Sequence, residues 1–280
     1  MTKTLYVSDL DGTLLGSDAT VSDNTRSILN SLISQHGVMF TVATARTPAT
    51  VVGLMDGIEA RLPYILMAGG AVWDNARRAY THVQTLADDT VGRLLSLFDA
   101  HGVRPFVYRQ HGNQICVHHE AAMTNREHDF ITPRLGTPYK RLVVDGRLSA
   151  ADPDPAMLMF AIGDFDCMRA LADDIDRHHI DCSYNCYHDV AEAGTGILDV
   201  YRTGTTKAAA IRQVAAECGA DRIVVFGDNL NDIPMSSVAD YSVAVANAFD
   251  EVKAAFDEVI GSNDEDAVAK WIMNDVKRTL

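Results

Sequence analysis

Two carboxylates stand two residues apart in the segment Asp9-Leu10-Asp11-Gly12-Thr13, which directly follows a short apolar run at residues 5–8. Alternate side chains of an extended chain project to the same side, so both acids can face one ligand. One of them can bind a metal ion and attack an electrophile while the other moves protons. A simple turn built from favourable turn residues is the structural alternative, and this segment alone does not decide between the two.

A second acidic loop, with the sequence Gly-Asp-Asn-Leu-Asn-Asp, occupies residues 227–232 and follows another apolar run. Carboxylate oxygens combined with water suit Mg²⁺, which commonly uses one or two protein carboxylates. We expect Asp228 to be such a ligand, and Asn231 and Asp232 can hold ligands and metal-bound water in place. Two acidic loops, each at a predicted strand end, favour one shared site over two unrelated polar turns.

Two further polar groups lie between these loops along the chain. Thr44-Ala45-Arg46 follows a predicted strand, and Lys207 stands at the start of a predicted helix. A threonine hydroxyl and neighbouring backbone N–H groups can hold phosphate oxygens, and a lysine supplies the positive charge that lets a carboxylate approach a dianion. Taken singly, the threonine is also typical of a helix cap and the lysine of a solvated surface.

The elements that must position these residues follow an alternating pattern. Short apolar runs alternate with segments of helical periodicity, which is typical of a parallel sheet wrapped by helices. A helix begins after Ser22 and ends at Gly37, and Thr47 and Thr206 precede two further helices. The expected core strands are residues 5–8, 38–43, 64–68, 197–201, 223–226 and 243–246.

A different mixture of strands and helices separates the two halves of this pattern. A hairpin is expected near residues 71–85, followed by an amphipathic helix at residues 88–101 and further short strands. We therefore predict a catalytic core formed by residues 1–82 and 190–280, with an inserted α+β domain at residues 83–189.

Composition limits the classes of partner. The 280 residues are 47% hydrophobic and carry a net charge of −14, so the chain can build a real core but repels nucleic acid and anionic lipid. No stretch approaches the roughly 20 apolar residues of a membrane span. The five scattered cysteines are expected to be reduced and mostly buried thiols. The N-terminus does not have the pattern of a signal peptide, and a cytoplasmic location is expected.

The order of the motifs resembles the haloacid dehalogenase (HAD) superfamily of phosphohydrolases, in particular its Cof-type sugar-phosphatase branch. The motifs that carry the resemblance are Asp-x-Asp-Gly-Thr, Thr-x-Arg, a lysine, and Gly-Asp-x-x-Asn-Asp, within residues 1–82 and 190–280. The resemblance implies a Rossmann-like α/β core with a parallel sheet and an inserted α+β cap domain. The inserted segment lies between the threonine and lysine motifs, as it does in that branch.

The resemblance also implies a role for each motif. Asp9 would be the nucleophile and Asp11 the general acid and base, while Thr44 and Lys207 would bind phosphate. A Mg²⁺ ion would be held by Asp9, the backbone carbonyl of Asp11 and Asp228, with support from Asp232. The residues expected to contact the substrate are Thr13, Arg46 and Asn231.

Three positions depart from the branch pattern. The family usually has glycine where Ala45 stands, and often glycine where Ala267 stands. The branch often has Asn-Gly-Ala after its third strand, whereas this chain has Gly69-Gly70-Ala71. These departures concern substrate contacts more than the reaction.

The expected activity is Mg²⁺-dependent hydrolysis of a small phosphorylated metabolite, with sugar phosphates as first candidates, through an aspartyl phosphate. A phosphotransferase or phosphomutase using the same intermediate is the main alternative. A phospho-accepting signalling module and a silent sugar-phosphate sensor are the others, and both fit the full motif set less well. The substrate and the oligomeric state cannot be read from the sequence.

Overall fold

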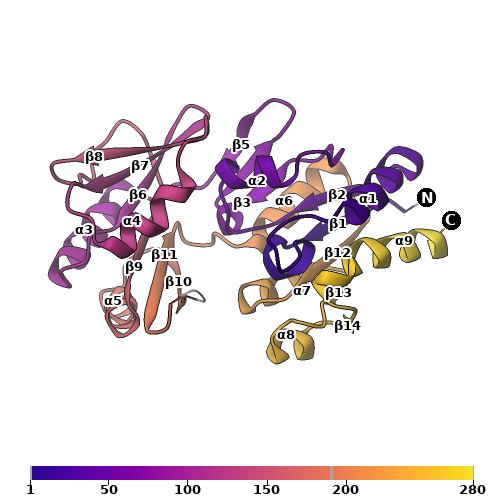
Figure 1. The fold of residues 1–280 in the computed structure, drawn as a ribbon. Coiled ribbons are helices and arrows are strands. Elements are labelled where there is room, and N and C mark those ends of the chain that lie inside the picture. Colours follow the sequence, from indigo (N-terminus) through magenta and orange to yellow (C-terminus); the bar gives the residue numbers. More distant parts are fainter. Residues whose placement is uncertain (1, 190–191, 280) are drawn as a thin grey trace. The chain divides into compact units, whose positions relative to one another are not determined.

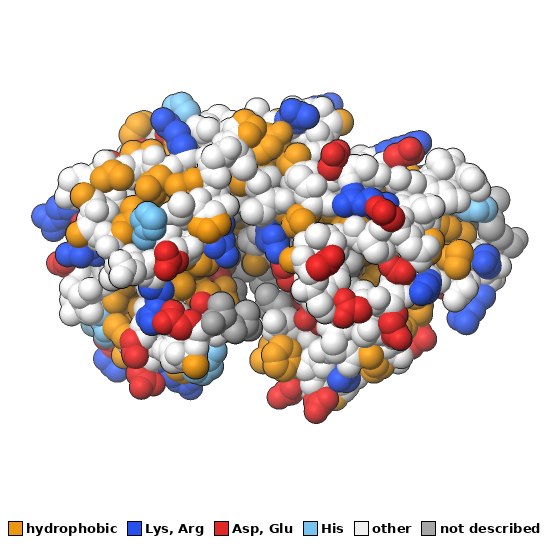
Figure 2. Space-filling model, viewed as in Figure 1, with side chains coloured by type: hydrophobic (Ala, Val, Ile, Leu, Met, Phe, Trp, Pro, Cys, Tyr) orange, Lys and Arg blue, Asp and Glu red, His pale blue; other side chains and the backbone are white. Residues whose placement is uncertain are grey.

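The computed structural model describes residues 2–189 and 192–279, and the chain divides into two compact units (Figure 1). Unit 1 comprises Met1–His82 and Thr206–Leu280, and unit 2 comprises Val83–Thr205. Within the described residues, every helix is too short or too polar to cross a membrane. Figure 2 shows acidic side chains spread over the visible face of unit 1, in keeping with the negative net charge.

Unit 1 is built on a parallel sheet with the strand order β14-β13-β12-β1-β2. Its strands are β1 (Thr4–Ser8), β2 (Met39–Val42), β12 (Arg222–Gly227), β13 (Tyr241–Ala244) and β14 (Glu258–Val259). β1 lies between β12 and β2, and Ser8 is in register with both Phe226 and Val42. The carboxyl ends of these three strands therefore meet at one edge of the sheet, where open α/β proteins bind ligands.

Three helices of unit 1 begin directly after the residues that the sequence indicates, Ser22, Thr47 and Thr206. Ser22 accepts a hydrogen bond from the backbone N–H of Thr25, and Gly37 ends the first helix with φ +65°. The helices are α1 (Asp23–His36), α2 (Pro48–Leu54), α6 (Lys207–Cys218), α7 (Ile233–Ser236), α8 (Asp250–Ala255) and α9 (Ala267–Thr279). A small second sheet contains β3 (Tyr64–Leu66), β4 (Ala71–Asp74) and β5 (Ala79–Val83).

Unit 2 consists of a mixed sheet with the strand order β10-β11-β9-β6-β7-β8 and three helices. Its elements are α3 (Asp88–Ala100), β6 (Phe106–His111), β7 (Gln114–Glu120), α4 (Asn125–Ile131), β8 (Lys140–Asp145), β9 (Ala156–Asp164), α5 (Phe165–Arg177), β10 (Ser183–His188) and β11 (Thr195–Tyr201). Phe98 of α3, Leu171 of α5 and Met159 of β9 belong to one buried cluster. The two long helices thus cover one face of the sheet. A parallel core sheet with an inserted mixed sheet confirms the predicted α/β class.

One expected core strand lies in the other unit. Residues 197–201, predicted to extend the parallel sheet of the core, form part of β11, which pairs antiparallel with β9 and β10 in unit 2. Every residue of β11 is buried, so its composition suits either sheet. The sheet that it joins is decided by pairing with strands that are distant in the sequence. The predicted boundary at residue 190 falls outside the described residues. All five cysteines are free thiols as expected, but only Cys116 is buried.

Candidate active site

The chain leaves β1 through a tight turn that brings Asp9 and Asp11 to the edge of the sheet. The Asp9 N–H still donates to the Phe226 carbonyl at 2.9 Å, so Asp9 continues the strand ladder. Gly12 follows with φ +76°, and a Cβ atom at this position would lie 2.4 Å from Asp228 Oδ2. Glycine is therefore required here both for the backbone conformation and for the close approach of the Asp228 carboxylate.

Three carboxylates converge beside this turn, of which Asp9 and Asp232 are buried and Asp228 is partly buried. Oxygen atoms of Asp9, Asp228 and Asp232 lie within 4.8 Å of one another. Lys207 Nζ donates to Asp9 Oδ1 at 2.5 Å and to Asp232 Oδ1 at 2.7 Å. The ammonium group thus ties the first strand to the loop after β12, and it leaves the second oxygen of Asp9 available for another partner.

The carboxylates outnumber the cations in this cluster. Burial raises the pKa of Asp9 well above its usual range, and Lys207 opposes this increase. Burial also raises the pKa of Asp228 to about 6, although Thr13 partly offsets the effect by a hydrogen bond. The pKa of Lys207 is lowered by burial but raised more strongly by Asp232 and Asp9, so it stays charged. Three acids facing one ammonium form a site that a divalent cation would neutralise.

Neighbouring polar groups hold the ligands of this cluster in place. Thr13, expected to contact substrate, is buried and donates from its hydroxyl to Asp228 Oδ1 at 2.8 Å. Asp232 Oδ2 accepts from the backbone N–H groups of Asp228 and Asn229, both at 3.1 Å. Both oxygens of Asp232 are therefore occupied, which suits a supporting position rather than direct metal binding. Asn231 lies on the exposed side of the loop.

The loop after β2 carries Thr44 and Arg46, and it belongs to unit 1, as the carboxylate cluster does. Thr44 is buried, and its Oγ1 accepts the backbone N–H of Arg46 at 3.1 Å, which leaves the hydroxyl proton free to donate. The guanidinium of Arg46 binds the carboxylate of Asp11 at two points, with distances of 2.7 Å and 2.5 Å. Arg46, expected to contact substrate, is therefore paired with the expected acid and base.

The departures from the family pattern have local structural reasons. Ala45 is exposed and has no left-handed backbone, so its methyl group is accommodated. Gly69 has φ +96°, and a Cβ atom there would lie 2.2 Å from the carbonyl oxygen of Thr206. The loop after β3 thus packs directly on the start of α6. Ala267 is buried at the start of α9.

Asn247 is a site residue that the sequence did not indicate. Its Nδ2 donates to the carbonyl of Gly12 at 2.7 Å, and its Oδ1 accepts the backbone N–H of Asn263 at 3.0 Å. Asn263 Nδ2 in turn donates to the carbonyl of Leu15 at 2.8 Å. Two asparagines from C-terminal loops therefore hold the middle and the C-terminal end of the turn that carries Asp11.

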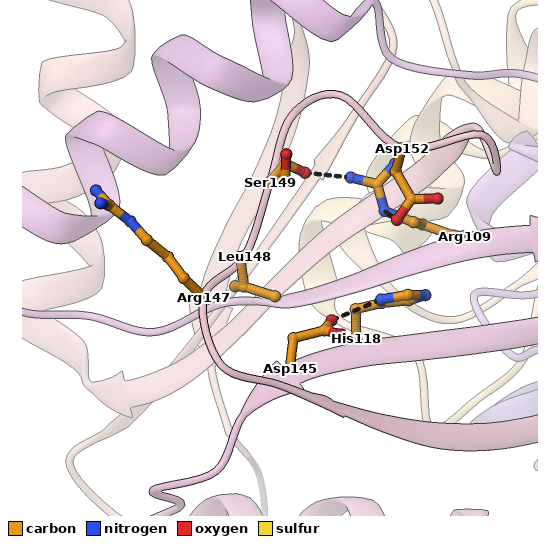
Figure 3. Close-up of a pocket in the computed structure, with 7 residues that line it drawn as sticks. All are labelled: Arg109, His118, Asp145, Arg147, Leu148, Ser149 and Asp152. Atoms are coloured by element: carbon orange, nitrogen blue, oxygen red, sulfur yellow. Dashed lines mark hydrogen bonds and ion pairs between the residues drawn. The ribbon is translucent and has the colours of Figure 1, made fainter.

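A cavity in unit 2 is lined by charged groups of both signs. This cavity of about 80 Å³ is lined by Arg109, His118, Asp145, Arg147, Leu148, Ser149 and Asp152. Figure 3 shows His118 bonded to Asp145 and Arg109 reaching the loop above, while Arg147 points away. The opposite charges in this cavity offset one another, and we assign no ligand to it.

Elsewhere in unit 2, two buried ionisable side chains each share a hydrogen bond with a tyrosine. Lys140 donates to Tyr108 Oη at 3.5 Å, and burial with the nearby Arg134 lowers the pKa of Lys140 to about 7. Tyr187 donates to Asp199 at 3.0 Å, and burial raises the pKa of Asp199 to about 7. Both groups can be neutral near pH 7, which explains how the interior accommodates them.

The fold places a carboxylate cluster at the carboxyl edge of a parallel sheet. The chain belongs to the haloacid dehalogenase-like hydrolase family, whose model matches residues 6–272. It is a phosphatase of the HAD superfamily. This family membership confirms the resemblance drawn from the motifs.

Several relatives match nearly the whole length of the chain. A 5-amino-6-(5-phospho-D-ribitylamino)uracil phosphatase of Bacillus subtilis is 25% identical over 94% of this chain and 95% of its own. A pyridoxal phosphate phosphatase of Escherichia coli is 22% identical over 97% and 98%. The solved structure of a HAD subclass IIB sugar phosphatase superimposes with a TM-score of 0.74 at 22% identity and covers 98% of this chain and 99% of its own. This last likeness concerns the fold.

Proposed function

We propose that the protein is a Mg²⁺-dependent phosphomonoesterase that works through an aspartyl phosphate, an acyl phosphate formed on Asp9. The observation that carries this proposal is the position of Lys207 Nζ, bound to Asp9 at 2.5 Å and to Asp232 at 2.7 Å inside a buried carboxylate cluster. A cation in contact with the attacking carboxylate reduces its repulsion from a phosphoryl dianion. The other oxygen of Asp9 is left to react.

The carboxylate cluster fits a hard divalent cation. Asp9, the backbone carbonyl of Asp11 and Asp228 would hold Mg²⁺, because oxygen donors are the ligands that this ion prefers. The bound ion would supply positive charge to the phosphoryl oxygens. Thr13 fixes the orientation of Asp228, and Asp232 fixes the loop and Lys207. The excess of negative charge in this buried group is the feature that favours a cation.

The protein side chains divide the two half-reactions between them. A carboxylate oxygen of Asp9 attacks phosphorus, the ester P–O bond breaks, and Asp11 gives its proton to the leaving alcohol. Water then attacks the phosphorus of the aspartyl phosphate and passes a proton to Asp11, and inorganic phosphate leaves as Asp9 is restored. Thr44 and Lys207 hold the phosphoryl oxygens during both steps.

The ester is a small phosphorylated metabolite, with sugar phosphates as first candidates. Relatives named for a ribitylaminouracil phosphate and for pyridoxal phosphate widen the search to esters with a heterocyclic group. We assign the choice of substrate to unit 2, because all the catalytic residues proposed here lie in unit 1. The test is phosphate release with Mg²⁺ from a panel of these esters, with and without an added sugar acceptor. Release from none of them would overturn the proposal, and transfer to the acceptor would identify a phosphotransferase.

Removal of the metal is expected to abolish turnover. Activity should disappear with a chelator and return with added Mg²⁺. Asp228→Asn should raise the Mg²⁺ concentration for half-maximal activity, because it removes one negative oxygen from the cluster. Asp250→Asn, at an exposed position in α8, is the matched control and should change nothing. Full turnover in chelator would contradict the metal-assisted mechanism.

Gly12→Ala is expected to weaken metal binding without removing a ligand. The added methyl group would meet Asp228 Oδ2 at 2.4 Å and displace it, so the Mg²⁺ requirement should rise about 10- to 100-fold, as for other disturbed ligand supports. Gly37→Ala is the control, because Gly37 also has a positive φ, of +65°, but open space around its Cβ position. Equal Mg²⁺ titration curves for both variants would show that the contact with Asp228 has no role.

A further inference from the structure

Arg46 and Asp11 form a two-point ion pair in unit 1. Arg46 Nε donates to Asp11 Oδ2 at 2.7 Å, and Arg46 Nη2 donates to Asp11 Oδ1 at 2.5 Å. One guanidinium thus engages both oxygens of the carboxylate. The pair is partly open to solvent, with 28% of the Arg46 side chain and 54% of the Asp11 side chain exposed. Solvent reaches both groups, so either of them can exchange its partner without leaving a buried charge unpaired.

This pairing conflicts with the task of Asp11 in the proposed reaction. Asp11 must face the leaving oxygen in the first step and a water molecule in the second. While both oxygens of Asp11 accept N–H groups of Arg46, neither oxygen is available to the leaving group or to the water molecule. The pair must therefore open before Asp11 can take part in either step.

The backbone of Arg46 is fixed, whereas its guanidinium is not otherwise held. The backbone N–H of Arg46 donates to Thr44 Oγ1 at 3.1 Å, and its carbonyl accepts from Met67 N–H at 3.0 Å. Among the residues that the structure describes, the guanidinium makes its hydrogen bonds to Asp11 alone. The side chain can consequently move from a firm base beside Thr44, the residue to which we assign phosphate binding.

We propose that Arg46 is a positioning residue that exchanges Asp11 for the phosphoryl group when substrate binds. A phosphoryl dianion offers the guanidinium two parallel acceptor oxygens and more charge than a carboxylate does. Its arrival draws Arg46 away and releases Asp11 toward the leaving group. Without a phosphoryl group, the pair keeps Asp11 out of use. This inference rests on the proposed function, because it assumes that a phosphoryl group binds beside Thr44.

The test is a double-mutant cycle read by calorimetric binding of inorganic phosphate in the presence of Mg²⁺. Asp11→Asn removes the competitor for Arg46, so it should tighten phosphate binding about tenfold or more when Arg46 is present, but less than about threefold in Arg46→Ala, a gap typical of directly coupled residues. The effect of Asp11→Asn in the Arg46→Ala protein includes any direct repulsion between Asp11 and phosphate. The difference between the two effects therefore measures the competition alone.

A conservative variant and a surface control sharpen this test. Arg46→Lys keeps the charge but cannot bind Asp11 at two points, so its coupling with Asp11→Asn should fall between those of arginine and alanine. Arg77→Ala, which removes an exposed arginine paired with Asp74 at 3.5 Å, should leave phosphate binding unchanged. Thermal unfolding of each variant checks that the fold is kept.

The outcomes separate the two proposals. Equal effects of Asp11→Asn with and without Arg46 would overturn the exchange, even if the wild-type protein hydrolyses phosphate esters. A wild-type protein that neither binds phosphate nor hydrolyses any ester of the panel would overturn both the exchange and the proposed function. Unequal effects in the expected direction would support both.

Discussion

Asp9→Asn is expected to reduce kcat by a factor of about 10⁴ or more, as the loss of a nucleophile does in other hydrolases. An amide oxygen is a poor nucleophile. Asp9 is the carboxylate on the turn after β1, where Lys207 contacts it at 2.5 Å, and we assign the covalent step to it. The fold should survive, because asparagine has nearly the same shape and can still accept a hydrogen bond from Lys207. Steady-state kinetics with the best ester of the panel provide the measurement.

Two controls protect this experiment. Asp18→Asn lies in the same N-terminal region, at an exposed position that binds Thr20, and it should keep full activity. Mass spectrometry must exclude deamidation of the Asp9→Asn protein, which would restore the wild-type enzyme. Acid-quenched wild-type protein should carry phosphate on Asp9 during turnover. A near-normal kcat in an intact Asp9→Asn protein would show that the nucleophile is another group.

Lys207→Met is expected to abolish activity and to lower the free energy of unfolding by about 3–5 kcal/mol, the usual cost of removing one partner from a buried ion pair. Asp9 and Asp232 would lose the cation that lies between them. Lys253→Met is the matched control, because Lys253 pairs with the exposed Asp250 at 3.5 Å on the surface of α8. Denaturant unfolding of both variants measures the difference.

The loss of stability in Lys207→Met should depend on pH. Without the ammonium, burial keeps the carboxyl pKa of Asp9 above its value in the unfolded chain, so the folded state is penalised most at neutral pH. The penalty should shrink as the pH falls toward about 4, where the unfolded chain also binds the proton. Lys207→Met with Asp232→Asn should recover part of the stability but no activity. A penalty that does not change with pH would contradict the electrostatic explanation.

The core of the fold was predictable because its signals are local. Ser22 and Gly37 mark the two ends of α1 by capping and by a left-handed conformation, and the apolar run before Asp9 forms β1, which lies between β12 and β2. Parallel strands place their carboxyl ends together, so the meeting of Asp9 and Asp228 follows from the topology alone. Prediction succeeded where one segment carries its own signal.

Unit 2 was predicted less completely, for two reasons. β11 is uniformly buried, and nothing within its residues shows that it pairs with β9 rather than with a core strand. β8 and α4 were not predicted at all. The α4 helix did carry a signal, since Thr124 and Glu127 form a capping box that could have been found from their spacing.

Contacts of the site that depend on distant backbone were also missed. Asn247 stands in a loop without any motif, and its partner is the carbonyl of Gly12, 235 residues away. Arg46 was expected on the substrate, but the structure pairs it with Asp11. A sequence shows which side chains can bind an anion, whereas the carboxylate that such a side chain contacts within the protein depends on geometry that only the fold supplies.

Gly69 limits how the sequence of this protein can be recombined with that of its relatives. Because a Cβ atom at residue 69 would meet the Thr206 carbonyl at 2.2 Å, a segment that brings asparagine to this position forces the start of α6 to move. That displacement would reach Lys207, the next residue along the chain. Chimaeric phosphatases built from this chain should therefore inherit the loop after β3 and the first turn of α6 from the same parent, although 136 residues of sequence separate Gly69 from Thr206. In a library of recombined sequences, functional members should carry both segments from one parent.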